Sequence, residues 1–598
     1  MNEKLVVAID FESYYKEKHC SIKEQGILGY INHPEFDAYL VSVVTEDGKE
    51  FCGHPSDFDF NCLQKYDWLS HNKGFDQTLY RFLQKKGIID APEPERWYCT
   101  ADLVAYHGIA RDLATALHFV FEVEMDKSVR DRMNGKRWKD LTPEEQGELV
   151  EYCLDDSRWL PKLWRELSPG WPEAERKISD LTFEMKNRGL PIDAVKLDKS
   201  IRHLNRKMFE MVEDIPWWDA PTKKNKTPLS DVLMAEECRK NGLPVPSSRS
   251  KDSQDAAAWI EEYGEKYPFI EAMQNWASAN TLLQKLLTLQ DRIVFPDDGD
   301  FAWMPYGLKY CGAHTGRDAG GDGFNALNLH KAEIFGVDLR SHIVPPPGYR
   351  FLWADFSQIE PRVLAWLVED EEFLERLRAG EDPYVAFGLG TLGHKGEWGS
   401  ADRQLWKVMV LQLGYGSGWK KFMEVALKYG VELTPAEAKR LVYKVYQKKN
   451  KRVKDFWKEL ETNLRRASIT KGGSGTFIIP LPNGRTQIYR NVRGNSNLQA
   501  IVCAEKGFMN KHLYGGLLCE NVVQAIARDV FMDKYLELED EGFPIVLRVY
   551  DEYLSLVRED EAEERRVQMG EIMRKPVPWA PDLPLAAEAK IIDFYQKD

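Results

Sequence analysis

Residues 350–367 join a short apolar run to a helical pattern, and one acid separates the two. Residues 350–354 follow a Pro-Gly turn and have the composition of a buried strand. Asp355 ends that run, and apolar residues then recur at helical spacing from Ile359 to Leu367. A carboxylate at such a junction lies on a rigid, partly dry edge, which suits a metal ligand. The alternative is that Asp355 only caps the helix, which is a common role for an acid before an apolar helix.

A second acidic stretch lies near the other end of the chain. Residues 543–557 contain two β-rich runs, and Asp551 and Glu552 lie between them, which predicts a hairpin with carboxylates at its bend. A plain hairpin turn would also explain these acids. Strand-end carboxylates that meet would repel one another without cations between them. Two Mg²⁺ ions about 3.5–4 Å apart would meet that need and could drive in-line phosphoryl transfer.

A third stretch, between these two, repeats functional side chains at intervals of four. Such an interval places residues on one face of a helix, and two cations, an apolar side chain and an aromatic ring suit a triphosphate with a base stacked beyond it. Taken alone, the stretch would be an amphipathic helix with a solvated basic edge. The residues are Arg403, Lys407, Leu411 and Tyr415.

In their order and spacing the three stretches resemble motifs A, B and C of the A-family DNA polymerases. Motif A is Asp355-Phe-Ser-Gln-Ile-Glu-Pro-Arg362, motif B runs from Arg403 to Tyr415-Gly416, and motif C is Tyr550-Asp551-Glu552. The resemblance implies template-directed transfer of dNTPs to a primer 3′ end. It implies two Mg²⁺ ions, for which Mn²⁺ can substitute, on Asp355, Asp551 and the carbonyl of Phe356, with Glu552 in support.

The resemblance also implies how the nucleotide is held. Arg403 and Lys407 would neutralise the triphosphate, and Lys407 could protonate the departing pyrophosphate. Tyr415 would stack near the templating position, and Glu360 would pack against it and crowd the sugar 2′ position. The remaining nucleotide-binding positions are Gln358, Tyr384 and Leu411.

Several positions depart from the usual family residues. Leu411 replaces Phe or Tyr, Tyr384 replaces a phosphate-contacting His, Tyr550 replaces the His of motif C, and Leu327 replaces Gln. We expect Leu411 to discriminate more strongly against chain terminators than a Tyr would. The resemblance implies the following DNA contacts: Arg317, Asn325, Asn328, Gln524 and Tyr550.

The N-terminal part carries a second acidic set. Asp10 and Glu12 end an apolar strand and share one of its faces, Asp76 precedes a helical pattern, and Tyr152 and Asp156 are one helical turn apart. These residues resemble the three motifs of the DnaQ-like 3′–5′ exonucleases, which have an RNase H-like fold. The resemblance implies an active proofreading site with two Mg²⁺ ions on the four carboxylates and Tyr152 orienting the attacking water.

With 598 residues, the chain is too long for a single core. The breaker cluster Ser168-Pro-Gly-Trp-Pro172 predicts a boundary between an exonuclease domain, 1–168, and a polymerase domain, 169–598. We expect a mixed α/β fold, with an RNase H-like domain followed by a right-hand palm, fingers and thumb. The thumb would span about 195–300 and the fingers about 370–475. No region is left for a 5′ nuclease.

Composition limits the remaining possibilities. Hydrophobic residues at 43% and charged residues at 29% are typical of a soluble globular protein, no apolar run could span a membrane, and no Cys-x-x-Cys pair suggests zinc. Because the net charge is −14, any binding of DNA would depend on local basic patches. The candidates are Lys223, Lys224 and Lys226, and the run Lys448, Lys449, Lys451, Arg452 and Lys454.

The resemblance to phage-type members implies a replicative enzyme in the bacterial host cytoplasm. Its partners would be primer-template DNA, dNTPs and replisome proteins such as a helicase, a single-strand binding protein or a processivity factor. Three alternatives stay open. They are an exonuclease with a degenerate polymerase domain as scaffold, a single-subunit RNA polymerase, and a non-catalytic replication scaffold. Intact polymerase motifs oppose the first, and Glu360 with the exonuclease motifs opposes the second. Acids that would be costly without metals oppose the third.

Overall fold

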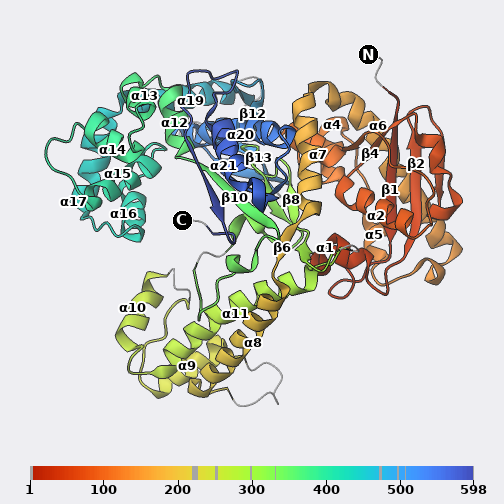
Figure 1. Cartoon of the computed structure of the whole chain (residues 1–598), viewed down its shortest axis with the longest axis horizontal. Coiled ribbons are helices and arrows are strands. Elements are labelled where there is room, and N and C mark those ends of the chain that lie inside the picture. Colours follow the sequence, from red (N-terminus) through yellow and green to blue (C-terminus); the bar gives the residue numbers. More distant parts are fainter. Residues whose placement is uncertain are drawn as a thin grey trace. The chain divides into compact units, whose positions relative to one another are not determined.

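The computed structural model describes residues 4–218, 227–249, 253–296, 299–329, 332–469, 475–494, 497–504 and 507–596 (Figure 1). Helices and strands are mixed along the chain, which confirms the predicted α/β class. The chain divides into two compact units. The first contains Met1–Arg188, Tyr306–Leu327 and Leu352–Ile591; the second contains Gly189–Pro305, Asn328–Phe351 and Ile592–Asp598.

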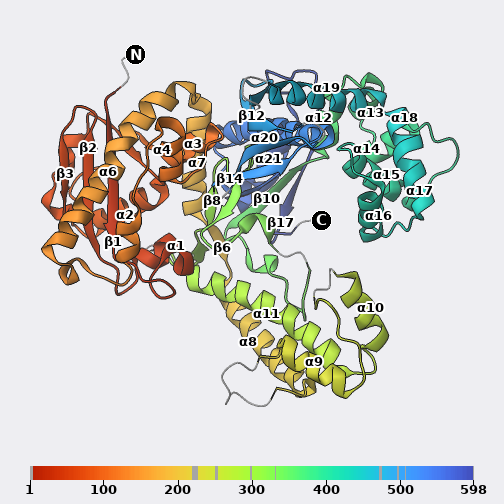
Figure 2. The same cartoon turned by 180° about the vertical axis from the view of Figure 1, so that it is seen from behind.

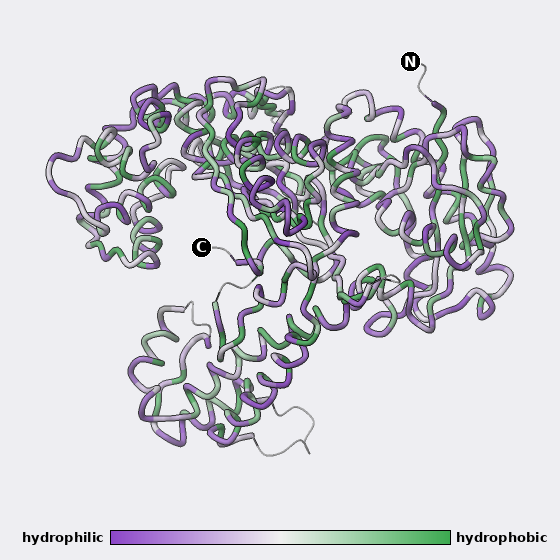
Figure 3. Tube along the Cα trace, viewed as in Figure 1, coloured by the Kyte–Doolittle hydropathy of each residue, from purple (hydrophilic) through white to green (hydrophobic). Residues whose placement is uncertain are grey.

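A five-stranded sheet organises the N-terminal part of the first unit. Its order is β3-β2-β1-β4-β5, with β1 antiparallel to β2 and parallel to β4. The central position of β1 explains its apolar composition, because Val7, Ala8 and Ile9 have no exposed surface. Figure 3 shows the hydrophobic traces of β1 and β2. The strands are β1 (Val6–Ser13), β2 (Ala38–Thr45), β3 (Glu50–Gly53), β4 (Asp67–Ser70) and β5 (Trp97–Cys99).

Helices cover this sheet, and the longest of them has clear sequence signals at its start. Pro143 occupies its first turn, and Thr142 and Glu145 form a capping box. It packs against β1 and β2, where the hydroxyls of Ser42 and Ser157 lie 2.6 Å apart. The helices are α1 (Ile22–Ile31), α2 (Lys73–Lys85), α3 (Thr100–Tyr106), α4 (Leu113–Phe121), α5 (Ser128–Arg132), α6 (Pro143–Leu167) and α7 (Glu173–Arg188).

A four-stranded sheet in the order β15-β16-β10-β17 carries the two C-terminal acidic stretches. Helix α20 is almost entirely buried and contacts α7, α12, α19 and α21. The elements are β10 (Tyr349–Phe356), β15 (Ile545–Val549), β16 (Glu552–Arg558), β17 (Ala587–Ile592), α12 (Ile359–Leu367), α20 (Gly515–Asp540) and α21 (Ala562–Arg574). The predicted strand at 350–354 and the predicted hairpin at 543–557 are both confirmed.

Two further sheets lie in the first unit. One is the antiparallel sheet β11 (Gly475–Pro480), β12 (Thr486–Arg493), β13 (Gln499–Ala504) and β14 (Gly507–His512). The other is the pair β8 (Gly307–Lys309) and β9 (Ala319–Gly321), whose connecting loop contains Arg317.

Residues 371–449 form a helical cluster, which Figure 2 shows, and its buried aromatic side chains include Phe387, Trp406 and Phe422. Its helices are α13 (Glu371–Arg378), α14 (Pro383–Ala386), α15 (Ser400–Leu413), α16 (Trp419–Lys428), α17 (Pro435–Lys439) and α18 (Gln447–Lys449). The next helix, α19 (Lys451–Ser468), packs against α20, β11 and β12.

The described part of the second unit is mainly helical. Helix α8 packs along α11, and a core forms around Trp217, Trp259 and Phe269. Its elements are β6 (Leu190–Ile192), α8 (Ala194–Met211), α9 (Asp231–Lys240), α10 (Gln254–Tyr263), α11 (Pro268–Arg292) and β7 (Ala302–Met304). In the described part of the chain, no helix has both the length and the apolar character needed to cross a membrane.

Candidate active sites

The two C-terminal acidic stretches meet across one sheet. Asp355 is the second-last residue of β10, and Asp551 lies in the tight turn between β15 and β16. The Phe356 amide donates to the Asp551 carbonyl at 3.0 Å, so the backbones of the two stretches are adjacent. Tyr550 has φ +56°, a left-handed conformation that sharpens this turn. Two acids that lie almost 200 residues apart in sequence therefore share one edge.

Asp355 does not cap the following helix, so that alternative is wrong. Helix α12 begins at Ile359, and its N-cap residue is Gln358, which has φ +49° and makes no capping bond with its side chain. The turn is held from elsewhere, since the Ser357 amide donates to the Ala586 carbonyl at 2.8 Å. The buried Arg362 donates through Nε to the Ser357 carbonyl at 2.7 Å. Asp355 thus remains on the strand.

Glu552 is buried and faces a neighbouring strand. Only 2% of its surface is exposed, and Trp353 Nε1 donates to its Oε2 at 3.2 Å. The contact ties β16 to β10 next in sequence to Asp551. This geometry suits a supporting acid.

Helix α15 carries the predicted cationic stripe. Arg403 Nη2 donates to Asp382 Oδ2 at 2.6 Å, and the Arg403 guanidinium lies 5.3 Å from the centre of the Tyr384 ring. The Lys407 ammonium lies 6.0 Å from the Tyr384 ring and 5.3 Å from the Tyr429 ring. Both cations thus gather around one aromatic side chain.

Tyr384 is a neutral hydrogen-bond donor at this place. It is 5% exposed, and burial together with the Asp382 carboxylate raises its pKa to about 12. Its backbone amide and that of Val385 both donate to Asp382 Oδ1 at 3.0 Å, which fixes the start of α14. Asp382 therefore holds Tyr384 with one oxygen and Arg403 with the other.

The stripe ends earlier than the fourfold spacing predicts. Leu411 lies on α15 with Arg403 and Lys407, but the helix ends at Leu413, and Tyr415 lies in the following turn. Gly414 is the C-cap, and Gly416 has φ +72°, so the two glycines stop the helix. Tyr415 is half-buried, and burial with the nearby Glu360 carboxylate raises its pKa far above the usual range.

The predicted DNA-contacting residues are distributed over several elements. Arg317 Nη2 donates to Glu360 Oε1 at 2.6 Å, Asn325 Oδ1 accepts from the Leu327 amide at 3.0 Å, and Gln524 on α20 donates to Glu520 Oε1 at 3.2 Å. Asn325, Asn328 and Tyr550 are exposed. Leu327 is 7% exposed, so it does not offer the surface contact of the Gln it replaces.

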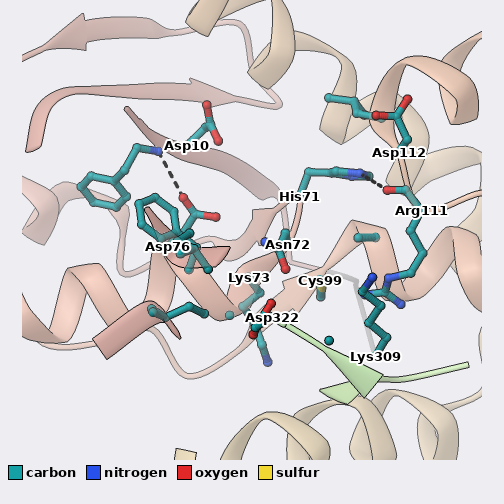
Figure 4. Close-up of a pocket in the computed structure, with 18 of the residues that line it drawn as sticks. Asp10, His71, Asn72, Lys73, Asp76, Cys99, Arg111, Asp112, Lys309 and Asp322 are labelled. Atoms are coloured by element: carbon teal, nitrogen blue, oxygen red, sulfur yellow. Dashed lines mark hydrogen bonds between the residues drawn. The ribbon is translucent and has the colours of Figure 1, made fainter. Parts of the chain in front are cut away.

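The N-terminal acids line a cavity of about 720 Å³ (Figure 4). Asp10 and Glu12 lie on β1, Tyr152 and Asp156 lie on α6, and Asp76 lies in the first turn of α2, which begins three residues before the acid rather than after it. The Phe11 amide donates to Asp76 Oδ1 at 3.1 Å and joins the first two motifs. The structure brings the whole predicted set together.

These carboxylates disfavour one another's charge. Burial, followed by the carboxylates of Asp76, Glu12 and Asp156, raises the pKa of Asp10 far above its usual range. Burial raises the pKa of Glu12 to about 7 and that of Asp156 to about 6. Oδ1 of Asp156 is buried and accepts no hydrogen bond from the residues described. As the side chains stand, no three Asp, Glu, His or Cys residues in the described ranges enclose an ion.

Several residues of this cavity carry no recognisable sequence signal. Arg130 on α5 and Lys127 lie on its wall, and the Arg130 carbonyl is fixed by the Tyr15 hydroxyl at 2.8 Å. The His71 ring donates through Nε2 to the Arg111 carbonyl at 2.7 Å, and burial lowers the pKa of His71 to about 4, so the ring is neutral. Lys127 and Arg130 lie in a segment without a motif, and only the fold places them beside the acids.

Of the two basic runs proposed from the sequence, the structure describes only the second. Lys223, Lys224 and Lys226 lie outside the described residues. The run at 448–454 lies on α18 and at the start of α19, where Arg452 donates to the carbonyl of Glu369. A role for this run in DNA binding stays a prediction.

Comparisons with known proteins cover most of the chain. The family model for DNA polymerase family A matches residues 196–597. A DNA polymerase of Bacillus phage SP02 is 26% identical, over 99% of this chain and 100% of that protein. DNA polymerase I of Aquifex aeolicus is 26% identical over 48% of this chain, and a thermostable DNA polymerase I of Thermus filiformis is 23% identical over 72%.

The chain spans about half the length of the two bacterial relatives, 47% and 49%. Among solved structures, it is similar to the POL domain of Pol1 from M. smegmatis in complex with DNA primer-template and dNTP. The TM-score is 0.64 at 17% identity, and the match covers 99% of this chain and 95% of that one. At that identity the match shows a shared fold.

Proposed function

The chain belongs to DNA polymerase family A, and we propose that it extends a primer with dNTPs at one site and removes its 3′ end at another. Template-directed DNA synthesis is the activity of the family. The finer proposal assigns synthesis to the edge that Asp355 and Asp551 share, and 3′–5′ proofreading to the cavity with Asp10, Glu12 and Asp156. The contact from the Phe356 amide to the Asp551 carbonyl is the observation that supports it most, because it joins motifs A and C.

Magnesium fits the chemistry of both sites. Carboxylate and carbonyl oxygens are the ligands that Mg²⁺ prefers, and Asp355, Phe356 and Asp551 supply them at one site. In the cavity, the raised pKa values and the unsatisfied Oδ1 of Asp156 indicate a place where a cation would relieve repulsion. Two bound Mg²⁺ ions would supply activation of the nucleophile and stabilisation of the leaving oxygen.

The side chains around Asp355 and Asp551 would bind and orient the nucleotide. Arg403 and Lys407 would neutralise the triphosphate, and Tyr384 would donate a hydrogen bond without adding charge. Arg403 is already paired with Asp382, so it is held in place before the nucleotide arrives. Gln358 and Leu411 would complete the nucleotide site, and Tyr415 would stack beside the templating base.

In the cavity, Tyr152 would orient water. It is 8% exposed, and burial with the nearby acids raises its pKa far above its usual range, so its hydroxyl keeps the proton. A neutral phenol can donate to one partner and accept from water. Asp10, Glu12, Asp76 and Asp156 would hold the cations.

Primer extension on a templated hairpin with Mg²⁺ tests the assignment. We expect the wild type to extend the primer, Asp355→Ala only to degrade it, and Asp10→Ala to extend without degrading. A wild type that only degrades would favour an exonuclease with a polymerase scaffold. Preference for ribonucleotides would favour an RNA polymerase, and no reaction at either site would favour a non-catalytic scaffold.

The phage relative supports a role in phage DNA replication inside a bacterial host. A helicase, a single-strand binding protein or a processivity factor would then be the partners. Complementation of a replication-defective phage by the cloned chain, with Asp355→Ala as the negative control, tests that role.

A further inference from the structure

The loop between β8 and β9 reaches motif A through one ion pair. Arg317 Nη2 lies 2.6 Å from Glu360 Oε1, and the two side chains are 18% and 25% exposed. A pair this enclosed is screened less by solvent than an ordinary surface pair. Residues 43 positions apart in sequence are thus linked beside the proposed nucleotide site.

Two arginine side chains hold the backbone of the loop that carries Arg317. The Thr315 carbonyl accepts from Arg485 Nη2 at 3.2 Å, and the Gly316 carbonyl accepts from Arg528 Nε at 3.0 Å. Gly316 has φ +85°, and a Cβ there would lie 2.4 Å from Arg485 Nη1, so only glycine fits this close approach. The loop closes on itself, because the Ala313 amide donates to the Arg317 carbonyl at 2.9 Å.

A buried ionic network supports the two arginines that hold the loop. Arg528 and Asp529 are each 1% exposed, and Arg528 Nη2 donates to Glu175 Oε2 at 2.8 Å. Arg485 Nε donates to Asp529 Oδ1 at 2.6 Å. Because buried charges keep their positions only with these partners, the carbonyls before Arg317 are fixed to α7 and α20.

The Glu360 side chain has several staggered rotamers open to it. A glutamate has three rotatable side-chain bonds, and Glu360 lies in the first turn of α12 with its side chain 25% exposed. Tyr415 lies near its carboxylate. On the other side of Arg317, the Tyr550 ring centre is 5.7 Å from the guanidinium. One cation thus lies among side chains from motifs A and C.

We propose that Arg317 is a positioning residue that fixes the Glu360 carboxylate against the sugar and thereby sets the selection of deoxyribose over ribose. This inference rests on the proposed role of Glu360 in crowding the sugar 2′ position. Without the guanidinium, Glu360 would sample rotamers that leave room for a 2′ hydroxyl. Arg317 then acts on the nucleotide through Glu360 in addition to any contact with DNA.

A double-mutant cycle tests this role. For the wild type, Arg317→Ala, Glu360→Ala and the double variant, the kcat/KM for a dNTP is divided by that for the matching rNTP on one primer-template. We expect Arg317→Ala to lower this ratio about tenfold, or about 1.4 kcal/mol. In the Glu360→Ala background the same change should leave the ratio unaltered, because nothing remains to be positioned.

Other variants separate positioning from DNA binding and from folding. Arg317→Lys keeps the charge and should lower the ratio less than Arg317→Ala, and Glu360→Gln keeps the shape and should resemble Arg317→Ala. Loss of a DNA contact would raise the Kd for primer-template equally in both backgrounds without changing the sugar ratio. Arg566→Ala is the matched control, since Arg566 pairs with Glu563 on the exposed face of α21.

The outcomes distinguish two failures. An unchanged ratio in Glu360→Ala would remove the sugar-selecting role of Glu360 and the role of Arg317 with it. In the second case, Glu360→Ala changes the dNTP/rNTP ratio, but Arg317→Ala has the same effect on it with and without Glu360. Glu360 would then still select the sugar, and only the positioning role of Arg317 would be overturned.

Discussion

Leu411 lies in the fourth turn of α15, four residues after Lys407. It is half-buried, and neither ring nor hydroxyl is available from this position, whereas the family usually supplies a Phe or Tyr there. A side chain with a ring fills more of the space beside the sugar 3′ position. The natural Leu should therefore respond to the presence of a 3′ hydroxyl differently from an aromatic residue.

We predict that Leu411→Tyr increases incorporation of dideoxynucleotides relative to deoxynucleotides by about tenfold, the scale of one good hydrogen bond. The measurement is the ratio of kcat/KM for ddNTP and dNTP on one template. Leu411→Phe is the matched control, because it adds the ring without the hydroxyl. If Leu411→Tyr leaves termination unchanged, Leu411 does not sense this part of the sugar.

At the scale of single residues, the sequence identifies acids better than their partners. The carboxylates of both sites could be found because an acid at the end of an apolar strand is unusual. The pairing of Arg317 with Glu360 could not, since it depends on a loop that is held by residues more than 160 positions further along the chain. The same holds for Arg130, which reaches the acidic cavity from a region without a motif.

At the scale of elements, α7 and α20 are joined in two ways. Glu175 and Arg528 form a buried bidentate pair, with both side chains under 10% exposed. Lys177 and Asp540 pair on the outside of the same two helices, with exposures of 44% and 61%. Burial disfavours the Glu175 charge, but the guanidinium of Arg528, followed by that of Arg485, lowers its pKa to about 2.

We predict that Glu175→Gln destabilises the protein by about 3 kcal/mol, because it leaves a buried guanidinium without its counter-charge. The matched control Lys177→Ala should change stability by less than about 0.5 kcal/mol. Denaturant unfolding at neutral pH measures both. Equal effects of the two variants would mean that the buried network does not stabilise this junction.

Lowering the pH gives a second test of the Glu175–Arg528 pair. The folded-state pKa of Glu175 lies below its ordinary value of 4.5, so its contribution is present above about pH 4.5 and is lost as the pH falls toward 2. The stability difference between wild type and Glu175→Gln should therefore shrink over that interval.

The elements themselves were largely predictable, and the exceptions have local causes. The strand at 350–354 and the hairpin at 543–557 follow from their composition and occur as predicted. Spacing alone placed Tyr415 on α15, where two glycines end the helix first. The capping alternative for Asp355 failed because a left-handed Gln358 starts α12 instead.

At the scale of the whole molecule, both proposed sites belong to the first compact unit. That unit combines three separate stretches of sequence. The breaker cluster in the sequence instead predicts two consecutive domains with a boundary near residue 168. Helix α7 follows that point and still contacts β5, β8 and β15. Such long-range packing cannot be obtained from local composition, and the serial boundary stays a prediction.

The acidity of the cavity at β1 gives the molecule a testable response to magnesium. In the metal-free protein the folded-state pKa of Glu12, about 7, exceeds its ordinary value of 4.5. Its proton thus stabilises the folded state below about pH 4.5, and this contribution is lost as the pH rises through 7. Mg²⁺ needs the deprotonated carboxylate and should offset that loss.

We predict that Mg²⁺ raises the unfolding midpoint more at about pH 8 than at about pH 6, with a difference in stabilisation of about 1 kcal/mol or more. Glu12→Gln should lose this pH dependence, because the titrating ligand is gone. Asp355→Asn should keep this pH dependence, because the cavity is intact. This variant therefore shows whether the polymerase site contributes to the Mg²⁺ effect. An equal Mg²⁺ effect at both pH values would mean that protons and cations do not compete there. The four carboxylates would then be a structural cluster, and proofreading would have to be sought elsewhere in the chain.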